Sequence, residues 1–176
     1  MTKRLWLSVA AVATLASIAS VSARPNESRN FVAHLSGGDE VPVRDSRGQG
    51  QAIFHLSKDG TELHYKLIVA NIENVVAAHI HIAAAGVNGP VVVFLFGPVA
   101  SGGGRTDGVL ATGSVTAANF IGPLAGHPMA DLIAALRSGG AYVNVHTNDG
   151  VDGVNTGPGD FPGGEIRGQI RTAGPK

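Results

Sequence analysis

Short runs in which apolar and polar residues alternate dominate this chain, and they constrain its fold more than any other feature. From Asn30 onward, glycine, proline and small polar clusters interrupt these runs every few residues. A period of two is typical of strands with one buried face, and closely spaced turn signals favour many short strands. The pattern predicts strands at about 31–35, 51–56, 63–69, 75–82, 91–96, 109–115, 141–146 and 165–171.

Two further segments complete this prediction. Residues 91–96 are apolar throughout, which indicates a strand buried on both faces, and residues 101–108 have the composition of an exposed loop. Apolar residues at helical spacing follow Pro128, the expected first helical residue, and Gly139-Gly140 ends the run. We therefore predict an all-β fold, an antiparallel, Greek-key-like β-sandwich or flattened barrel of about eight strands with one short helix.

The N-terminal residues are typical of a secretory signal peptide. Lys3 and Arg4 precede an uncharged stretch at 5–21, and Val21-Ser22-Ala23 provides small residues for cleavage. A single transmembrane anchor is the alternative interpretation of this stretch. We expect a cleaved signal peptide at 1–23, a disordered N-terminal segment at 24–29 and one domain at 30–172, exported to a periplasm or secreted.

Charge and cysteine content narrow the classes of partner. Without Lys3 and Arg4 the chain keeps 11 basic and 13 acidic residues, a net charge of −2, and it has no basic run. We therefore expect no nucleic-acid partner and no membrane association after signal cleavage. The chain has no cysteine, so the exported domain must be held together by its core alone.

Three of the seven histidines form a candidate metal site. His79 and His81 are two residues apart on a predicted strand, so their side chains leave from the same face. His146 ends another predicted strand, on which it shares a face with Tyr142 and Asn144. If the two strands are neighbours, three imidazoles converge, and such a set suits copper or zinc.

The sequence favours a structural role for these histidines over a metal site. A neutral imidazole can donate its N–H to a backbone carbonyl or to a carboxylate such as Glu165. Glu165 and Arg167 alternate onto one face of the last predicted strand, and with Asn144 they would form a structural polar network.

Five local signatures occur in an order that resembles the CHRD domain family, named from chordin. They are FVAHLSG leading to EVP from residue 31, AHIH from 78, GVNGPVV from 86, YVNVHT from 142 and PGGEIRGQI from 162. The resemblance covers residues 30–171 and implies a stand-alone exported domain. In chordin, related domains belong to an extracellular protein that sequesters growth factors. The resemblance therefore implies a non-enzymatic binding module for an extracytoplasmic protein or surface polymer. It does not identify which residues of this chain would bind that partner.

The histidine pattern is also similar to that of copper–zinc superoxide dismutase, a β-sandwich enzyme with a His-x-His strand and a later histidine. Dismutase needs a bridging histidine soon after that strand, but none occurs between His81 and His127. The zinc ligands and the cysteines are also missing. Dismutase chemistry is therefore disfavoured, and no nucleophile elbow or phosphate-binding loop indicates another enzyme. We predict no catalytic residues.

Overall fold

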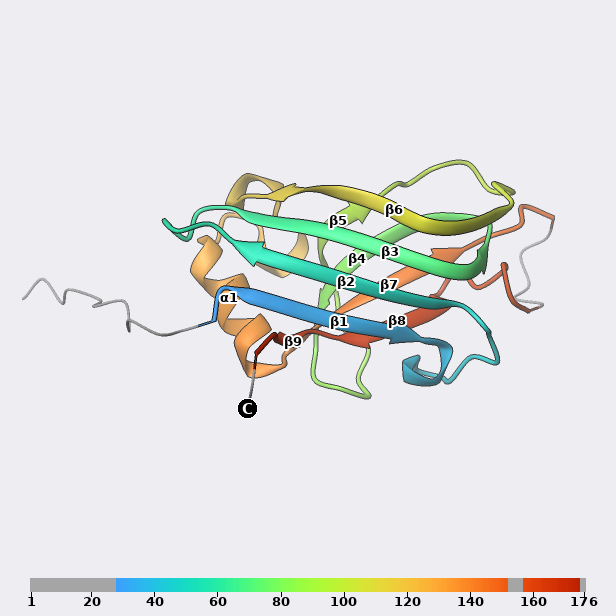
Figure 1. The fold of residues 1–176 in the computed structure, drawn as a ribbon, viewed down its shortest axis with the longest axis horizontal. Coiled ribbons are helices and arrows are strands. Elements are labelled where there is room, and N and C mark those ends of the chain that lie inside the picture. Colours follow the sequence, from blue (N-terminus) through green and yellow to red (C-terminus); the bar gives the residue numbers. More distant parts are fainter. Residues whose placement is uncertain (1–27, 152–156, 175–176) are drawn as a thin grey trace, which may run out of the picture.

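The computed structural model describes residues 28–151 and 157–174 (Figure 1). The predicted signal peptide and residues 24–27 of the predicted N-terminal segment lie outside this part of the chain. The described elements, besides three short 3-10 turns, are β1 (Asn30–Ser36), β2 (Gln49–Leu56), β3 (Leu63–Glu73), β4 (Val75–Ile82), β5 (Val91–Phe96), β6 (Arg105–Val115), α1 (Met129–Ser138), β7 (Ala141–Thr147), β8 (Ile166–Gln169) and β9 (Arg171–Thr172).

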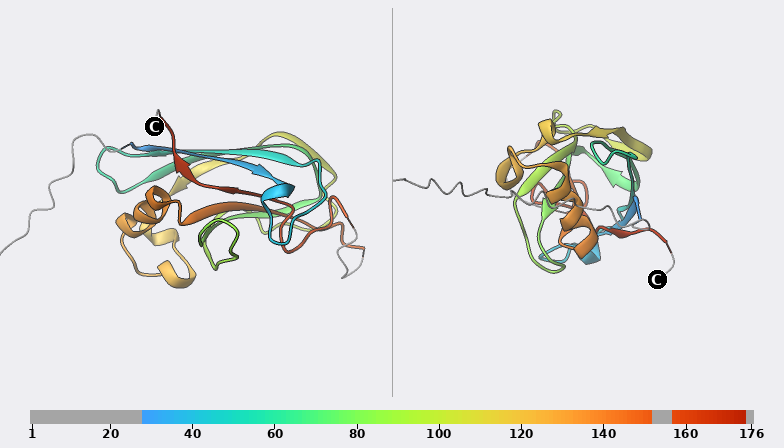
Figure 2. Two further views of the ribbon diagram at one scale, coloured as in Figure 1. Left: turned by 90° about the horizontal axis from the view of Figure 1, so that it is seen from below. Right: turned by 90° about the vertical axis from the view of Figure 1, so that its left-hand side faces the viewer.

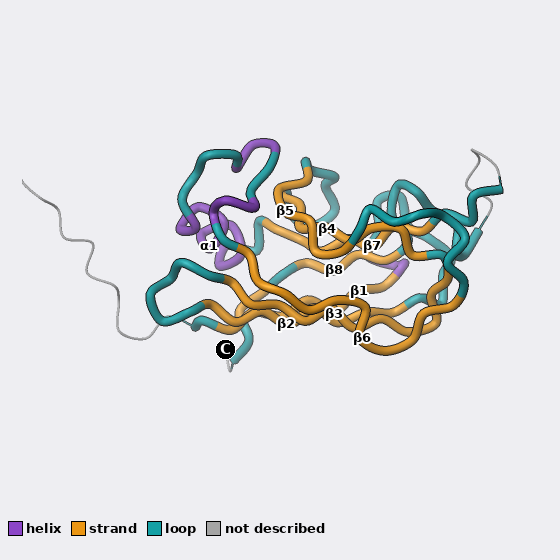
Figure 3. Tube along the Cα trace, turned by 90° about the horizontal axis from the view of Figure 1, so that it is seen from above, coloured by secondary structure: helices purple, strands orange, loops and turns teal. Residues whose placement is uncertain are grey.

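All paired strands are antiparallel and belong to one sheet. Its order is β5-β4-β7-β8-β1-β2-β3-β6, and β9 pairs with β1 beside β8. Figure 3 shows that the sheet folds over on itself, with β2, β3 and β6 on one side and β4, β5 and β7 on the other. The first and last strands of the order, β5 and β6, come close to each other. The result is a nearly closed, flattened barrel, which confirms the predicted fold class.

Strand alternation decides which side chains enter the barrel. In β1 and β2, Phe31 and Phe54 are register partners, and both are almost fully buried in the core. In β4, Ala78 and Ile80 are completely buried among the same core residues. Because successive side chains point to opposite faces, His79 and His81 lie on the outer face of the sheet.

Helix α1 lies across one end of the barrel (Figure 2). Two of its own residues, Leu132 and Leu136, are completely buried on the face that packs against the barrel, as the helical spacing predicts. Pro128 is the N-cap in extended conformation rather than the first helical residue, and Gly139 ends the helix at a φ of 70°. Within the described residues, no helix is long and apolar enough to cross a bilayer.

Two predicted segments differ from the structure. Strand β5 is at an edge of the sheet, and its outward-facing Phe94 is 45% exposed, so the prediction of burial on both faces was wrong. Residues from Arg105 to Gly108 belong to β6 and pair with β3 rather than forming a loop. In both cases pairing between distant strands decides the outcome, and local composition does not encode it.

A close approach of two backbones fixes the middle of the sheet at Gly168 on β8. A Cβ at this position would collide with the backbone carbonyl of His34 on β1. We expect Gly168→Ala to lower the free energy of unfolding by about 1–3 kcal/mol, because the strands must move apart. Urea denaturation checks this, with Gly103→Ala as the control, since a Cβ at Gly103 meets no atom within 4 Å. Equal stability of the two variants would contradict the prediction.

Candidate metal centre

The pairing of β4 with β7 brings the three predicted histidines together. In the register of these strands, His79 lies opposite Asn144, His81 opposite Tyr142, and Ala77 opposite His146. The three imidazoles therefore leave neighbouring positions on one outer face of the sheet. His79 and His81 are each only 8% exposed, and His146 is partly buried.

The three rings offer ligand nitrogens that all lie within 4.8 Å of one another. Nδ1 of His79 is 3.1 Å from Nε2 of His146. Two nitrogens bound to one ion at about 2.0–2.1 Å cannot lie more than about 4.2 Å apart, so the widest pair must approach slightly. The closest pair already has a separation suited to a shared ion.

Backbone carbonyls orient two of the rings. Nδ1 of His81 donates to the carbonyl of Gly89 at 2.9 Å, and Nδ1 of His146 donates to that of Pro162 at 2.8 Å. Because a carbonyl can only accept, Nδ1 carries the proton in both rings and each Nε2 keeps its lone pair. This is the arrangement in which metal-binding histidines are commonly held.

Two imidazole nitrogens of the cluster have no hydrogen-bond partner within the part of the chain that the structure describes. Nε2 of His79 and Nε2 of His81 are buried and have no hydrogen-bond partner in the described structure. A buried polar atom without a partner costs free energy, so these two nitrogens call for a water, an ion or another ligand. Among the described residues, one hydrogen bond joins two of these imidazoles, between Nδ1 of His79 and Nε2 of His146.

The surroundings keep all three imidazoles neutral. Burial, followed by the proximity of His146 and His81, lowers the pKa of His79 to about 3. Burial also lowers the pKa of His81 and that of His146, although their hydrogen bonds to backbone carbonyls act in the opposite direction. A neutral imidazole is the form that binds a metal ion, so these rings are ready to bind at neutral pH.

Aromatic side chains enclose the cluster. The ring of Tyr142 stacks on His81 with centroids 4.7 Å apart and planes 9° apart. Phe94 of β5 meets His79 edge-on at 4.5 Å. Phe94 could not be predicted as a site residue, because its strand is apolar throughout and its orientation depends on the pairing of β4 with β5.

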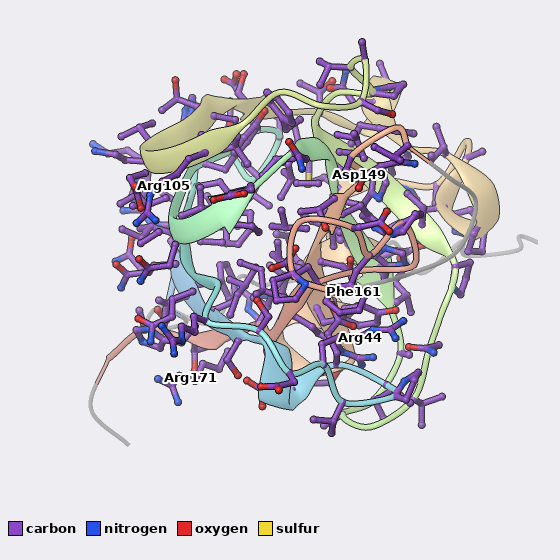
Figure 4. All side chains as sticks on the ribbon, turned by 90° about the vertical axis from the view of Figure 1, so that its right-hand side faces the viewer. Arg44, Arg105, Asp149, Phe161 and Arg171 are labelled. Carbon is purple, nitrogen blue, oxygen red and sulfur yellow. The ribbon has the colours of Figure 1, made fainter. Side chains whose placement is uncertain are left out.

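Glu165 fixes the loop that supplies the carbonyl to His146. Its carboxylate is fully buried and accepts hydrogen bonds from Ser46, Thr147 and the backbone N–H of Gly159. The hydroxyl of Thr147 in turn accepts the N–H of Phe161, the residue before Pro162. Figure 4 shows Arg44 beside Phe161, and the guanidinium carbon lies 4.8 Å from the ring centroid.

Arg167 fixes the loop that supplies the backbone carbonyl to His81. Its guanidinium donates to the carbonyls of Ala84 and Val87 and to Oδ1 of Asn88, the residue before Gly89. Arg167 is only 1% exposed. Neither Glu165 nor Arg167 hydrogen-bonds to an imidazole in the described structure, and each one orients a histidine through a loop.

Asn144, the third residue of the predicted polar network, binds Glu40, which was not among the predicted site residues. Its amide nitrogen donates to both carboxylate oxygens of Glu40, at 3.0 and 3.2 Å. Burial raises the pKa of Glu40 to about 7, against the lowering effect of Arg167. Oδ1 of Asn144 is buried without a partner, opposite His79. Glu40 begins the EVP signature, but neither that signature nor the local pattern indicates its burial or its contact with Asn144.

A separate polar pocket of about 470 Å³ is lined in part by Asp45, Arg47, Glu73 and Arg105. None of the three histidines lines it. Its charges are mixed in sign, and its lining has no aromatic ring, so it does not indicate a class of ligand.

Comparison with known families identifies the domain. The model of the CHRD domain matches residues 31–170, which is most of the chain. The chain belongs to the CHRD family. A search of curated proteins found no match. The match begins at the second residue of β1 and runs past the end of β8, so the three histidines and the residues that orient them lie inside the CHRD domain.

The lowered pKa of His79 predicts a specific dependence of stability on pH. Because the ring takes up its proton more readily when unfolded, the folded CHRD domain loses stability as pH falls from about 6.5 towards 3. We expect the wild type to lose about 1.4 kcal/mol per pH unit relative to His79→Gln over this range. Urea denaturation at several pH values measures the difference.

Glu40 contributes to the pH dependence of stability with the opposite sign, and this contribution cancels when the wild type is compared with His79→Gln. Its raised pKa stabilises the fold as pH falls, and it is present in both proteins. Parallel curves of stability against pH for the wild type and His79→Gln would contradict the prediction.

Proposed function

We propose that this CHRD protein is exported and binds a copper or zinc ion through His79, His81 and His146. The observation that carries the proposal is the convergence of three neutral imidazoles whose ligand nitrogens lie within 4.8 Å of one another. Imidazole nitrogen is a ligand that both metals accept, and three such ligands leave a position for a further group.

The way the rings are held supports binding rather than packing alone. Two of the rings donate through Nδ1 to backbone carbonyls, which leaves Nε2 of His81 without a partner and Nε2 of His146 engaged only by His79. All three rings already have a hydrogen-bond partner in the protein, as a structural role requires. The two Nε2 atoms of His79 and His81 are additional buried nitrogens, for which a water or an ion is expected as partner. The loops that supply the carbonyls are themselves fixed by the buried side chains of Glu165 and Arg167.

Export would place this site outside the cytoplasm, where the protein meets metal ions in a periplasm or outside the cell. The role of a non-enzymatic binding module for a protein or surface polymer stays a prediction, since no described surface selects a partner. We assign no catalytic step to the three histidines.

Metal titration of the mature domain tests the proposal. We expect one equivalent of Cu(II) or Zn(II) to bind, and His81→Ala or His146→Ala to weaken binding at least tenfold, because each removes one of three ligands. Isothermal titration calorimetry measures the affinity. His64→Ala is the matched control, since His64 is exposed on β3.

Thermal unfolding provides an independent readout of the same site. Metal at 100 times its dissociation constant should stabilise the folded wild type by about 2.7 kcal/mol, and should stabilise His81→Ala much less. Circular dichroism of each metal-free variant confirms that it is folded. Absence of saturable binding of Cu(II), Zn(II) and Cu(I) to the folded wild type would refute the proposed function.

A further inference from the structure

A buried positive charge lies beside the three-histidine cluster. The guanidinium carbon of Arg167 is 3.4 Å from the centroid of the Tyr142 ring, and Tyr142 stacks on His81. Strand β7, which carries Tyr142, lies between β4 and β8 in the sheet. His81 and Arg167 therefore flank Tyr142 from opposite sides, in a row of imidazole, phenol and guanidinium.

The charge of Arg167 is held in place by uncharged groups. Its hydrogen bonds go to two backbone carbonyls and to the side-chain oxygen of Asn88. The ring of Tyr142 contacts both the guanidinium of Arg167 and the imidazole of His81, so this charge lies one ring away from the cluster. The same positive charge must disfavour any cation bound to that ring.

Among the described residues the buried carboxyls are Asp160, Glu165 and Glu40, and the charge of Arg167 acts on that of Glu40. Arg167 lowers its pKa, but burial has the larger effect and raises the pKa to about 7. At pH 6 most Glu40 carboxyls are therefore neutral, and the charge of Arg167 is not compensated by this group. Glu40 is also not one of the possible metal ligands, which are the three histidines alone among the described residues.

The set of ligands is therefore uncharged, in contact with Phe94 and Tyr142, and adjacent to a fixed cation. Repulsion by Arg167 is proportional to the charge of the bound ion, and solvent screens it only in part because His79 and His81 are buried. Across roughly 10 Å at an effective dielectric constant near 20, one additional unit of charge weakens binding on the order of tenfold.

We infer that the cluster selects monovalent copper, Cu(I), over divalent ions. This inference rests on the proposed function, because it names the ion for the same three histidines. Arg167 is then a residue that determines specificity without touching the ion: it acts through charge, across the ring of Tyr142.

Redox titration of the copper-loaded mature protein at pH 6.0 tests the inference. In each titration one electron from the reductant converts bound Cu(II) to Cu(I), so the midpoint potential reports which ion the site prefers. We expect a potential above that of aqueous copper. We also expect Cu(I) to bind at least tenfold more tightly than Zn(II). Competition with the chromogenic chelator bicinchoninate under anaerobic conditions measures the affinity for Cu(I), and calorimetry measures the affinity for Zn(II).

Three variants separate charge from packing. Arg167→Gln should lower the potential by about 60 mV, the equivalent of a tenfold change for one electron. Arg167→Lys should retain most of the wild-type potential, because it keeps the charge while losing the planar stack. Arg171→Gln, at an exposed position on β9 that is labelled in Figure 4, should leave the potential unchanged.

The outcomes distinguish the two proposals. If no metal binds to the folded wild type, the proposed function fails and the inference fails with it. If Zn(II) or Cu(II) binds more tightly than Cu(I), or if a folded Arg167→Gln keeps the wild-type potential, only the inference is overturned. Should Arg167→Gln not fold, the wild-type potential and the competition with Zn(II) decide the inference without it.

Discussion

The antiparallel pairing of β4 with β7 is the constraint on which the candidate site depends. It places His79, His81 and His146 on one face at neighbouring register positions, while the opposite face of the same strands supplies Ile80 and Val143 to the core. A slip of one residue in either strand would turn that strand's histidines inward and its core residues outward. The hydrophobic core therefore enforces the register that brings the imidazoles together.

The outer face of β4, β7 and β8 is unusual because it is polar and yet buried. Asn144, Glu165 and Arg167 are all at most 3% exposed, and loops from distant parts of the chain cover them. Burying polar groups is costly unless they are hydrogen-bonded, and here most of their hydrogen bonds go to those loops. The loops are thereby fixed, and two of them supply the carbonyls that orient His81 and His146. Hydrogen bonds that satisfy buried polar groups thus also position the rings.

Different features of the sequence predicted the fold and the three histidines. The period of two and the frequent glycines were sufficient for an all-β fold, because a strand with one buried face must alternate. The spacing of His79 and His81 was sufficient to place both rings on one face. The burial of β5 was predicted wrongly, because an apolar strand such as 91–96 does not reveal whether it is central or at an edge.

What the sequence by itself determined is the strand pattern, the membership of the CHRD family and the supply of imidazoles. Only the tertiary structure decided that His146 meets His79, that Glu40 is buried against Asn144, and that Arg167 lies across Tyr142 from His81. The physical reason is that each of these contacts joins residues on different strands or loops, some of them more than 60 positions apart. Local preferences fix the conformation of one segment, whereas the pairing of distant segments depends on burying one common core.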